Sequence, residues 1–165
     1  MNHRPFVPWP HPVLRTAAKP VAAVTQEVRA IWDEMIAAMD AMPGVGLAAP
    51  QLGIPLALAV VDASDERGHA VRMANPQVLH ASIEPREHEE GSPNLPGVWA
   101  VISRPRAVTV RFVNADGETE DRDFVGLWAT SVQHQIDHLA GRMYFDHLSR
   151  LKRDRLLAKA RKHRR

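Results

Sequence analysis

The spacing of apolar residues predicts two amphipathic helices. Between residues 25 and 41 apolar side chains recur at helical intervals, Thr25 is suited to cap the first turn, and Pro43 and Gly44 end the run. Residues 126 to 140 show the same period, and Gly141 is suited to the C-terminal cap. A third helix is expected from Ser149, a candidate N-cap.

Between the first two helices the pattern changes to short apolar or alternating runs, which are typical of strands. We predict strands within 56–62, 72–79, 105–114 and 118–124, with Asp116 and Gly117 as the turn of an antiparallel hairpin. Glycine and proline in residues 44–55 predict a loop, and residues 82–105 are expected to be part loop and part strand. These elements together predict an α+β fold.

Length and proline distribution indicate how the chain is organised. The 165 residues, 45% of them hydrophobic, are expected to form a single domain, residues 1–165, with one continuous core. Five prolines between Pro5 and Pro20 predict an extended N-terminal arm over residues 1–20, with at most one short turn near Val13 and Leu14.

The positive charge is concentrated at the C-terminus. The net charge is only +2, yet the stretch RLKRDRLLAKARKHRR after Ser149 holds a single acid and predicts a basic helix over residues 149–165. Such a helix can contact ribosomal RNA phosphates, or it can be a solubilising helix whose Leu148, Leu151 and Leu156 face the body of the protein. We favour the solubilising helix, because a basic run alone is poor evidence of a specific partner.

Two absences limit the classes of function. No apolar run approaches the roughly 18 to 20 residues that span a bilayer, and the N-terminus lacks the apolar stretch of a signal peptide, so a cytoplasmic protein without a membrane partner is expected. The sequence contains no cysteine, which excludes disulfides, thiolate nucleophiles and thiolate metal ligands.

His134 and His138 are the sharpest candidate for chemistry. Two histidines four residues apart lie on the same side of a helix and can share a metal, although this short motif alone is weak evidence. In zincin-type sites a glutamate directly follows the first histidine and accepts the proton of the metal-bound water. Here Gln135 holds that position, and its amide can form hydrogen bonds but cannot act as a base.

The order of motifs resembles that of the peptide deformylase family. Residues 44–51, GVGLAAPQ, match the first family motif, Gly-x-Gly-Leu-Ala-Ala-Pro-Gln, at every position. Residues 133–141, QHQIDHLAG, are similar to the third motif, Gln-His-Glu-x-Asp-His-Leu-x-Gly, with Gln135 in place of the glutamate. The stretches HPVLRTAAKPV and MYFDHLS, and the pair Asn75-Pro76 after a strand, extend the resemblance over roughly residues 8 to 150.

The resemblance implies a fold, a reaction and the roles of several residues. It implies antiparallel sheets around the helix that carries His-x-x-x-His, and removal of the formyl group from the N-terminal formyl-methionine of nascent polypeptides. In the family two histidines and a cysteine hold a divalent metal. The two family histidines correspond here to His134 and His138, which the resemblance therefore implies as ligands. The resemblance also implies that Gln51 stabilises the oxyanion, with Gly46 beside the reacting carbonyl, and that some members contact the ribosome through a C-terminal helix.

The second family motif is where this chain departs from the pattern. Glu-Gly-Cys-Leu-Ser-x-Pro-Gly is replaced by EGSPNLPG at residues 90–97, so that Ser92 stands in place of the cysteine ligand. A serine hydroxyl is a weak, neutral ligand. Pro93 replaces the leucine whose main-chain N–H would bind the oxyanion, and proline has no N–H. We therefore predict that activity is lost or strongly reduced, and that iron, nickel or zinc binds weakly at His134, His138 and Ser92 or not at all.

Three functional hypotheses remain, in order of preference. The first is a catalytically degenerate homologue that binds peptide N-termini, the second a working metallohydrolase with a weakened site, and the third a ribosome- or RNA-associated protein. The acidic stretch that includes Glu84, Glu87, His88, Glu89 and Glu90 could supply a substitute ligand or base, although a run of charges is usually a solvated face. Ala129, Thr130 and Ser131, just before the histidines, are more polar than the wall of a methionine pocket, which hints at a changed ligand.

Overall fold

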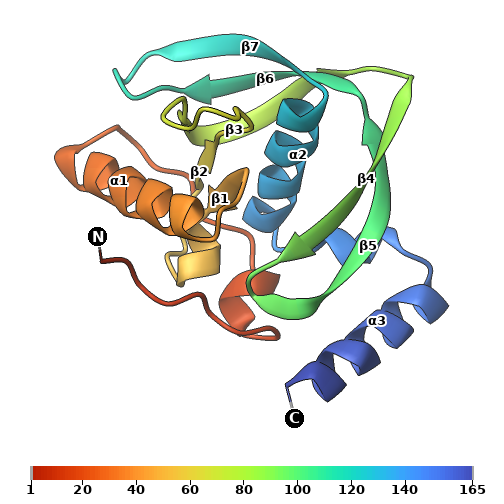
Figure 1. Cartoon of the computed structure of the whole chain (residues 1–165). Coiled ribbons are helices and arrows are strands. Elements are labelled where there is room, and N and C mark those ends of the chain that lie inside the picture. The colour runs from red at the N-terminus through yellow and green to blue at the C-terminus, as the bar shows by residue number, and fades with distance from the viewer. Residues whose placement is uncertain (1, 165) are drawn as a thin grey trace.

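The chain folds into two antiparallel sheets with one helix between them and a helix packed outside each sheet (Figure 1). A computed structural model describes residues 2–164. In chain order the elements are the 3-10 helix η1 (Pro12–Arg15), α1 (Gln26–Ala41), β1 (Gly46–Ala48), the 3-10 helix η2 (Ala49–Leu52), β2 (Leu58–Val61), β3 (Val71–Ala81), β4 (Pro85–Ser92), β5 (Leu95–Pro105), β6 (Ala107–Val113), β7 (Thr119–Val125), α2 (Leu127–Leu139), the 3-10 helix η3 (Tyr144–His147) and α3 (Arg150–His163). The expected α+β class is confirmed.

Helix α1 covers one side of the five-stranded sheet, whose strand order is β1-β2-β3-β6-β7. The Thr25 hydroxyl accepts the Val28 N–H and caps the helix, as the sequence predicted. Trp32 is fully buried in the core, and its indole N–H donates to the Met73 carbonyl at 3.2 Å. The predicted hairpin is also present, because β6 and β7 pair on either side of the turn at Asp116 and Gly117.

Helix α2 lies between the two sheets, so most of its faces are covered (Figure 1). Ala129 and Val132 pack against Phe112 and Phe124 of the large sheet, while other side chains of α2 face the β4–β5 hairpin. Gly141 ends the helix with φ +76°, and a side chain there would collide with the backbone of the N-terminal arm. This central position explains why polar residues of α2 are buried.

Three predicted segments differ from the structure. Residues 44–55, expected to be a loop, contain strand β1 and the 3-10 helix η2. Residues 82–105, expected to be part loop and part strand, are mostly strand: they form the β4–β5 hairpin with a turn of only Pro93 and Asn94. Asn75, expected to follow a strand, lies within β3 at an irregularity in the pairing with β6. Its side-chain amide accepts the N–H of Val21 and donates to the carbonyl of Val21, both at 2.9 Å.

Helix α3 packs across β5 with its apolar residues Leu156 and Ala160. Leu148 is also packed there, but Leu151 is 60% exposed, so the expectation that all three leucines face the body was wrong for Leu151. Basic side chains lie in solvent one helical turn before Leu156, at Lys152, and one turn after it, at Lys159. Within residues 2–164 no helix is long and apolar enough to cross a membrane.

Candidate functional site

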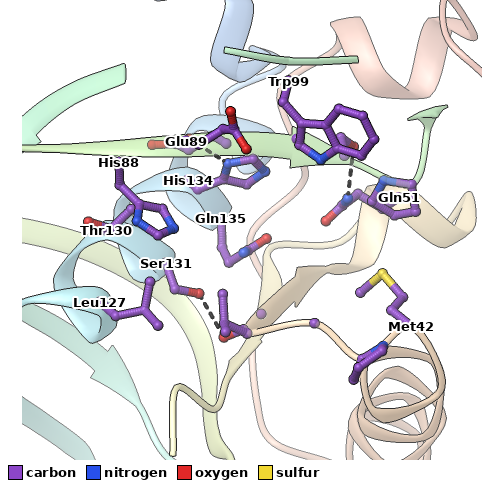
Figure 2. Close-up of a pocket in the computed structure, with 18 of the residues that line it drawn as sticks. Met42, Gln51, His88, Glu89, Trp99, Leu127, Thr130, Ser131, His134 and Gln135 are labelled. Carbon is purple, nitrogen blue, oxygen red and sulfur yellow. Dashed lines mark hydrogen bonds and ion pairs between the residues drawn. The ribbon is translucent and has the colours of Figure 1, made fainter. Parts of the chain in front are cut away.

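A cavity of about 440 Å³ opens between the β4–β5 hairpin, α2 and residues 42–46 (Figure 2). Of the residues assigned a role from the sequence, His138 does not line it, and six do: Gly46, Gln51, Ser92, Pro93, His134 and Gln135. Elements far apart in the sequence supply these residues: β1 and η2 carry the first motif, the tip of the hairpin carries the second, and α2 carries the third. The fold therefore brings the three motifs together.

The two histidines lie one turn apart on α2, with ring centroids separated by 4.9 Å. His134 Nδ1 is 2.8 Å from Glu90 Oε1, and this contact fixes the orientation of the ring. His138 is completely buried, and neither of its ring nitrogens has a hydrogen-bond partner within residues 2–164. Burial first, and then the electrostatic effects of His134 and Arg104, hold the pKa of His138 well below its ordinary value, so its imidazole is neutral.

A buried network of charges supports the histidine pair. Arg104 on β5 donates to both oxygens of Glu90, at 2.7 and 2.9 Å, and to Asp137 Oδ2 at 2.9 Å. His147 Nε2 lies 2.7 Å from the same Asp137 oxygen. Burial alone would raise the pKa of Glu90, but hydrogen bonds from His134 and Arg104 outweigh it and lower the pKa to about 2. Glu90 is therefore an ionised carboxylate whose two oxygens are engaged by Arg104 and His134.

The hydroxyl of Ser92 is part of a closed set of hydrogen bonds. It donates to Asn94 Oδ1 at 3.0 Å and lies 3.4 Å from Gln51 Nε2. Gln51 Nε2 donates to Asn94 Oδ1 at 2.8 Å, and Gln51 Oε1 accepts the Ala48 N–H at 3.0 Å. The side chain of Gln51 is thus held by its neighbours, and the hydroxyl of Ser92 is engaged by Asn94.

Pro93 and Asn94 form the tight turn of the hairpin between the paired residues Ser92 and Leu95. Neither turn residue has a positive φ, and the fixed φ of Pro93 suits the first position of such a turn. The side chain of Asn94 donates to the carbonyls of Val7 and Gln51 at 2.7 and 3.0 Å. Pro93 stabilises the turn, yet it offers no N–H toward the cavity.

Gln135 is 3% exposed, and its Oε1 has no hydrogen-bond partner within residues 2–164. Gly46 lies against this side chain. A Cβ at position 46 would collide with Gln135 Nε2 and with Ser131 Oγ. Only glycine allows β1 to approach α2 this closely.

These residues do not fit a tight three-ligand metal site. Two imidazoles are available, but the third position offers a neutral hydroxyl that is hydrogen-bonded to Asn94. The acidic stretch supplies no replacement, because Glu84, Glu87 and Glu89 are exposed and Glu90 is engaged by Arg104. Within residues 2–164, no group of three or more histidine, cysteine or acidic side chains is arranged to hold a metal ion.

Comparison with known proteins shows which family the chain belongs to. A sequence model described as polypeptide deformylase matches residues 3–154. The chain belongs to the peptide deformylase family. It is 40% identical to the peptide deformylase of Phenylobacterium zucineum over 165 residues, covering 99% of this chain and 98% of that one, and 43% identical to that of Caulobacter vibrioides over 154 residues, covering 92% and 89%. Membership of this family implies a divalent metal cofactor.

Solved structures of the peptide deformylase family share the fold. The peptide deformylase of Ehrlichia chaffeensis superposes with a TM-score of 0.92 at 28% identity, covering 99% of this chain and 97% of that chain. The peptide deformylase of Legionella pneumophila gives the same TM-score at 32% identity, covering 99% and 96%. The expected deformylase-like fold is thereby confirmed, while the roles of individual residues remain predictions.

Sequence reasoning missed the residues that hold the site together. Arg104 lies outside the recognised motifs, and His147 lies in the stretch MYFDHLS, but nothing in either local sequence indicates that the two meet Asp137. Asn94 lies within the second motif, where the family has serine. That substitution was visible in the sequence and could have indicated a changed hydrogen-bond network at the hairpin turn.

Proposed function

We propose that this member of the peptide deformylase family acts in the cytoplasm as a binding protein for peptide N-termini and hydrolyses formyl groups slowly or not at all. The closed hydrogen bonds among Ser92, Asn94 and Gln51 carry this proposal. They satisfy within the protein the groups that would otherwise hold a metal or polarise a formyl carbonyl. The cavity beside them remains large enough for a short peptide segment.

Each departure from the family pattern removes a separate part of the reaction. Loss of one oxyanion donor at Pro93 typically costs about a hundred- to a thousandfold in rate. Loss of the general base at Gln135 typically costs about a hundred- to ten-thousandfold. Because residues of one catalytic unit act together, these factors do not simply multiply, but either loss is sufficient to cripple hydrolysis.

The remaining residues of this chain support binding. Gln135 lines the cavity and its Oε1 lacks a partner within residues 2–164, so a ligand amide can donate to it. Glu90 and Arg104 hold His134 in a fixed orientation at the cavity wall. A ligand would therefore meet polar groups that are already oriented, which reduces the entropy lost on binding.

The test combines metal content, formate release and peptide binding. Protein purified without air is offered iron, nickel or zinc, and is then assayed with a formyl-methionyl tripeptide by calorimetry and by formate release. We expect peptide binding without added metal and no formate above background. Ser92→Cys with Gln135→Glu should recover metal binding, and formate release should return only when Pro93→Leu is added.

A weakened metallohydrolase is the second candidate, and the geometry of the histidines favours it. Histidines that bind a metal usually donate their other N–H to a carboxylate, and His134 meets Glu90 in this way. The unpartnered nitrogens of His138 are also available. Formate release that rises with added metal, vanishes with a chelator and is lost in His134→Ala would establish this function and refute the first proposal.

Ribosome or RNA association is the third candidate, and the exposed basic residues of α3 favour it. Lys152, Arg155 and Lys159 lie in solvent, whereas Leu156 packs into the core, so truncation of the helix would also damage the fold. Replacing the three basic residues with glutamate tests the contact without removing the helix. Cosedimentation with ribosomes that is lost in this variant and at high salt would support it.

A further inference from the structure

One side of the cavity is polar where it meets α2. His88 of β4 and Thr130 and Ser131 of α2 line this side, and Figure 2 shows them grouped with Leu127, away from Gln51. Thr130 and Ser131 are 4% and 2% exposed. We call the part of the cavity lined by His88, Leu127, Thr130 and Ser131 the side-chain subsite.

The hydroxyls of this subsite retain hydrogen-bonding capacity. Thr130 Oγ1 accepts a hydrogen bond from Arg86 at 2.9 Å, which leaves its own proton free to be donated. Ser131 Oγ donates to the Val45 carbonyl at 2.8 Å and can still accept. The wall of the subsite therefore contains both a donor and an acceptor in a region with little access to water.

Gln135 provides an independent sign that the subsite is built for a polar ligand. Its side chain and Ser131 Oγ lie against the same residue, Gly46, so the amide borders the subsite. The Gln135 side chain is almost fully buried, lines the cavity, and has no partner for Oε1 within residues 2–164. A buried acceptor without a partner is destabilising, and a ligand that donates to it removes that cost.

The charges around the subsite favour an acceptor group on the ligand. Arg86 brings a positive charge behind Thr130, and its hydrogen bond polarises the hydroxyl toward donation. Glu90, the buried acid on the same strand, is paired with Arg104 and hydrogen-bonded to His134. An oxygen acceptor at Thr130 is therefore met by a donor, while the other carboxylate that lines the cavity, Glu89, is exposed to solvent.

We infer that the side-chain subsite takes a residue whose side chain ends in an amide or carboxylate, such as glutamine or glutamate, in preference to an apolar residue such as methionine. An apolar side chain would offer no partner to the free proton of Thr130 or to Gln135 Oε1. Sites that hydrogen-bond a ligand strongly reject analogues lacking the polar group. The inference rests on the proposed function, because it names the class of peptide that is bound.

Three N-formyl tripeptides that differ only in the first residue, which is methionine, glutamine or glutamate, provide the test. Methionine and glutamine have similar length, so the comparison isolates polarity from size. Calorimetric titration of the full chain should give binding at least tenfold tighter for the glutamine or glutamate peptide. The glutamine and glutamate peptides together distinguish a neutral amide ligand from a charged one.

Two variants report on the hydroxyl itself. Thr130→Val removes it with little change of shape and should bring the ratio of affinities toward one, whereas Thr130→Ser should keep the preference. Thr109→Val, on β6 away from the cavity, is the matched control and should change nothing. If Thr130→Val does not fold, the peptide series on the unmodified chain and on Thr130→Ser still decides the question.

The outcomes separate this inference from the proposed function. Tightest binding of the methionine peptide would overturn the polar subsite and leave the binding function standing. No binding by any of the three peptides would overturn both. A preference for glutamine or glutamate that survives Thr130→Val unchanged would show that Thr130 does not create the preference, and would also contradict the inference.

Discussion

Replacing Arg104 with methionine should be among the most damaging changes outside the hydrophobic core. Arg104 is 4% exposed and makes three hydrogen bonds at 2.7–2.9 Å to Glu90 and Asp137. Methionine fills much of the same volume, so the loss is mainly electrostatic. Removing one partner of a buried ion pair typically costs about 3–5 kcal/mol, because the other charge is left uncompensated.

The loss of stability expected in Arg104→Met is large enough to measure by two methods. For a chain of this size about 1 kcal/mol corresponds to roughly 2–4 °C, so the unfolding midpoint should fall by roughly 6–20 °C. Urea unfolding followed by tryptophan fluorescence should give a lower midpoint with an unchanged slope, provided that the denatured state is unaltered. Arg106→Met removes an exposed pair with Glu84 and should match the unmodified protein within error.

A second substitution tests the electrostatic explanation. If an uncompensated carboxylate causes the loss, Arg104→Met with Glu90→Gln should recover at least half of it, because the amide keeps a hydrogen bond to His134 without the charge. An Arg104→Met variant within about 1 kcal/mol of the unmodified protein would refute the reasoning. So would a double variant less stable than the single one.

The remaining predictions concern other parts of the fold. Gly141→Ala should destabilise by about 1–3 kcal/mol or more in thermal unfolding, because φ is +76° and the new methyl would meet the backbone of the N-terminal arm. Leu156→Ala should cost about 2–5 kcal/mol and Leu151→Ala at most about 0.5 kcal/mol, and equal losses would contradict the packing of α3. Burial raises the pKa of Asp62, but hydrogen bonds led by that from the Ser64 hydroxyl outweigh it and hold the pKa below its usual value. In unfolding measured across pH, the advantage over Asp62→Asn should be complete above about pH 5 and shrink as the pH falls through about 4.

The sequence predicted the helices well because their pattern does not depend on distant contacts. In α1 every third or fourth residue faces the sheet, and Thr25 caps the helix through a neighbour three residues away. Likewise, the turn at Asp116 and Gly117 is a local feature that fixes the β6–β7 hairpin. In these elements local propensity and final packing agree.

The β4–β5 hairpin was only partly predicted, for a physical reason that also concerns the site. The residues of β4 that face inward include Arg86, His88 and Glu90, because the surface of α2 opposite them is polar. Strand alternation is recognised from apolar inner faces, and here the inner face is charged. The polar inner face of β4 forms part of the candidate site. For the same reason β4 lacks the apolar alternation from which a strand is predicted.

The motifs predicted which residues meet in the cavity, but not how they are satisfied. Gln51, Ser92 and Asn94 bond across intervals of up to 43 residues, and no local pattern encodes such a pairing. Whether the serine hydroxyl would be free or engaged depends on where Asn94 points. That information exists only in the folded chain.

The link between the hairpin turn and the N-terminal arm also constrains the order of folding. Asn94 binds the carbonyl of Val7 across 87 residues, and its own carbonyl accepts the N–H of Trp9 at 2.8 Å. Closing so long a loop costs entropy that only later packing can repay. During synthesis the arm emerges first, but Asn94 follows only after more than half of the chain has been made. The geometry of the cavity is therefore completed late, and an extension or deletion at the N-terminus should slow that last step before it affects the helices.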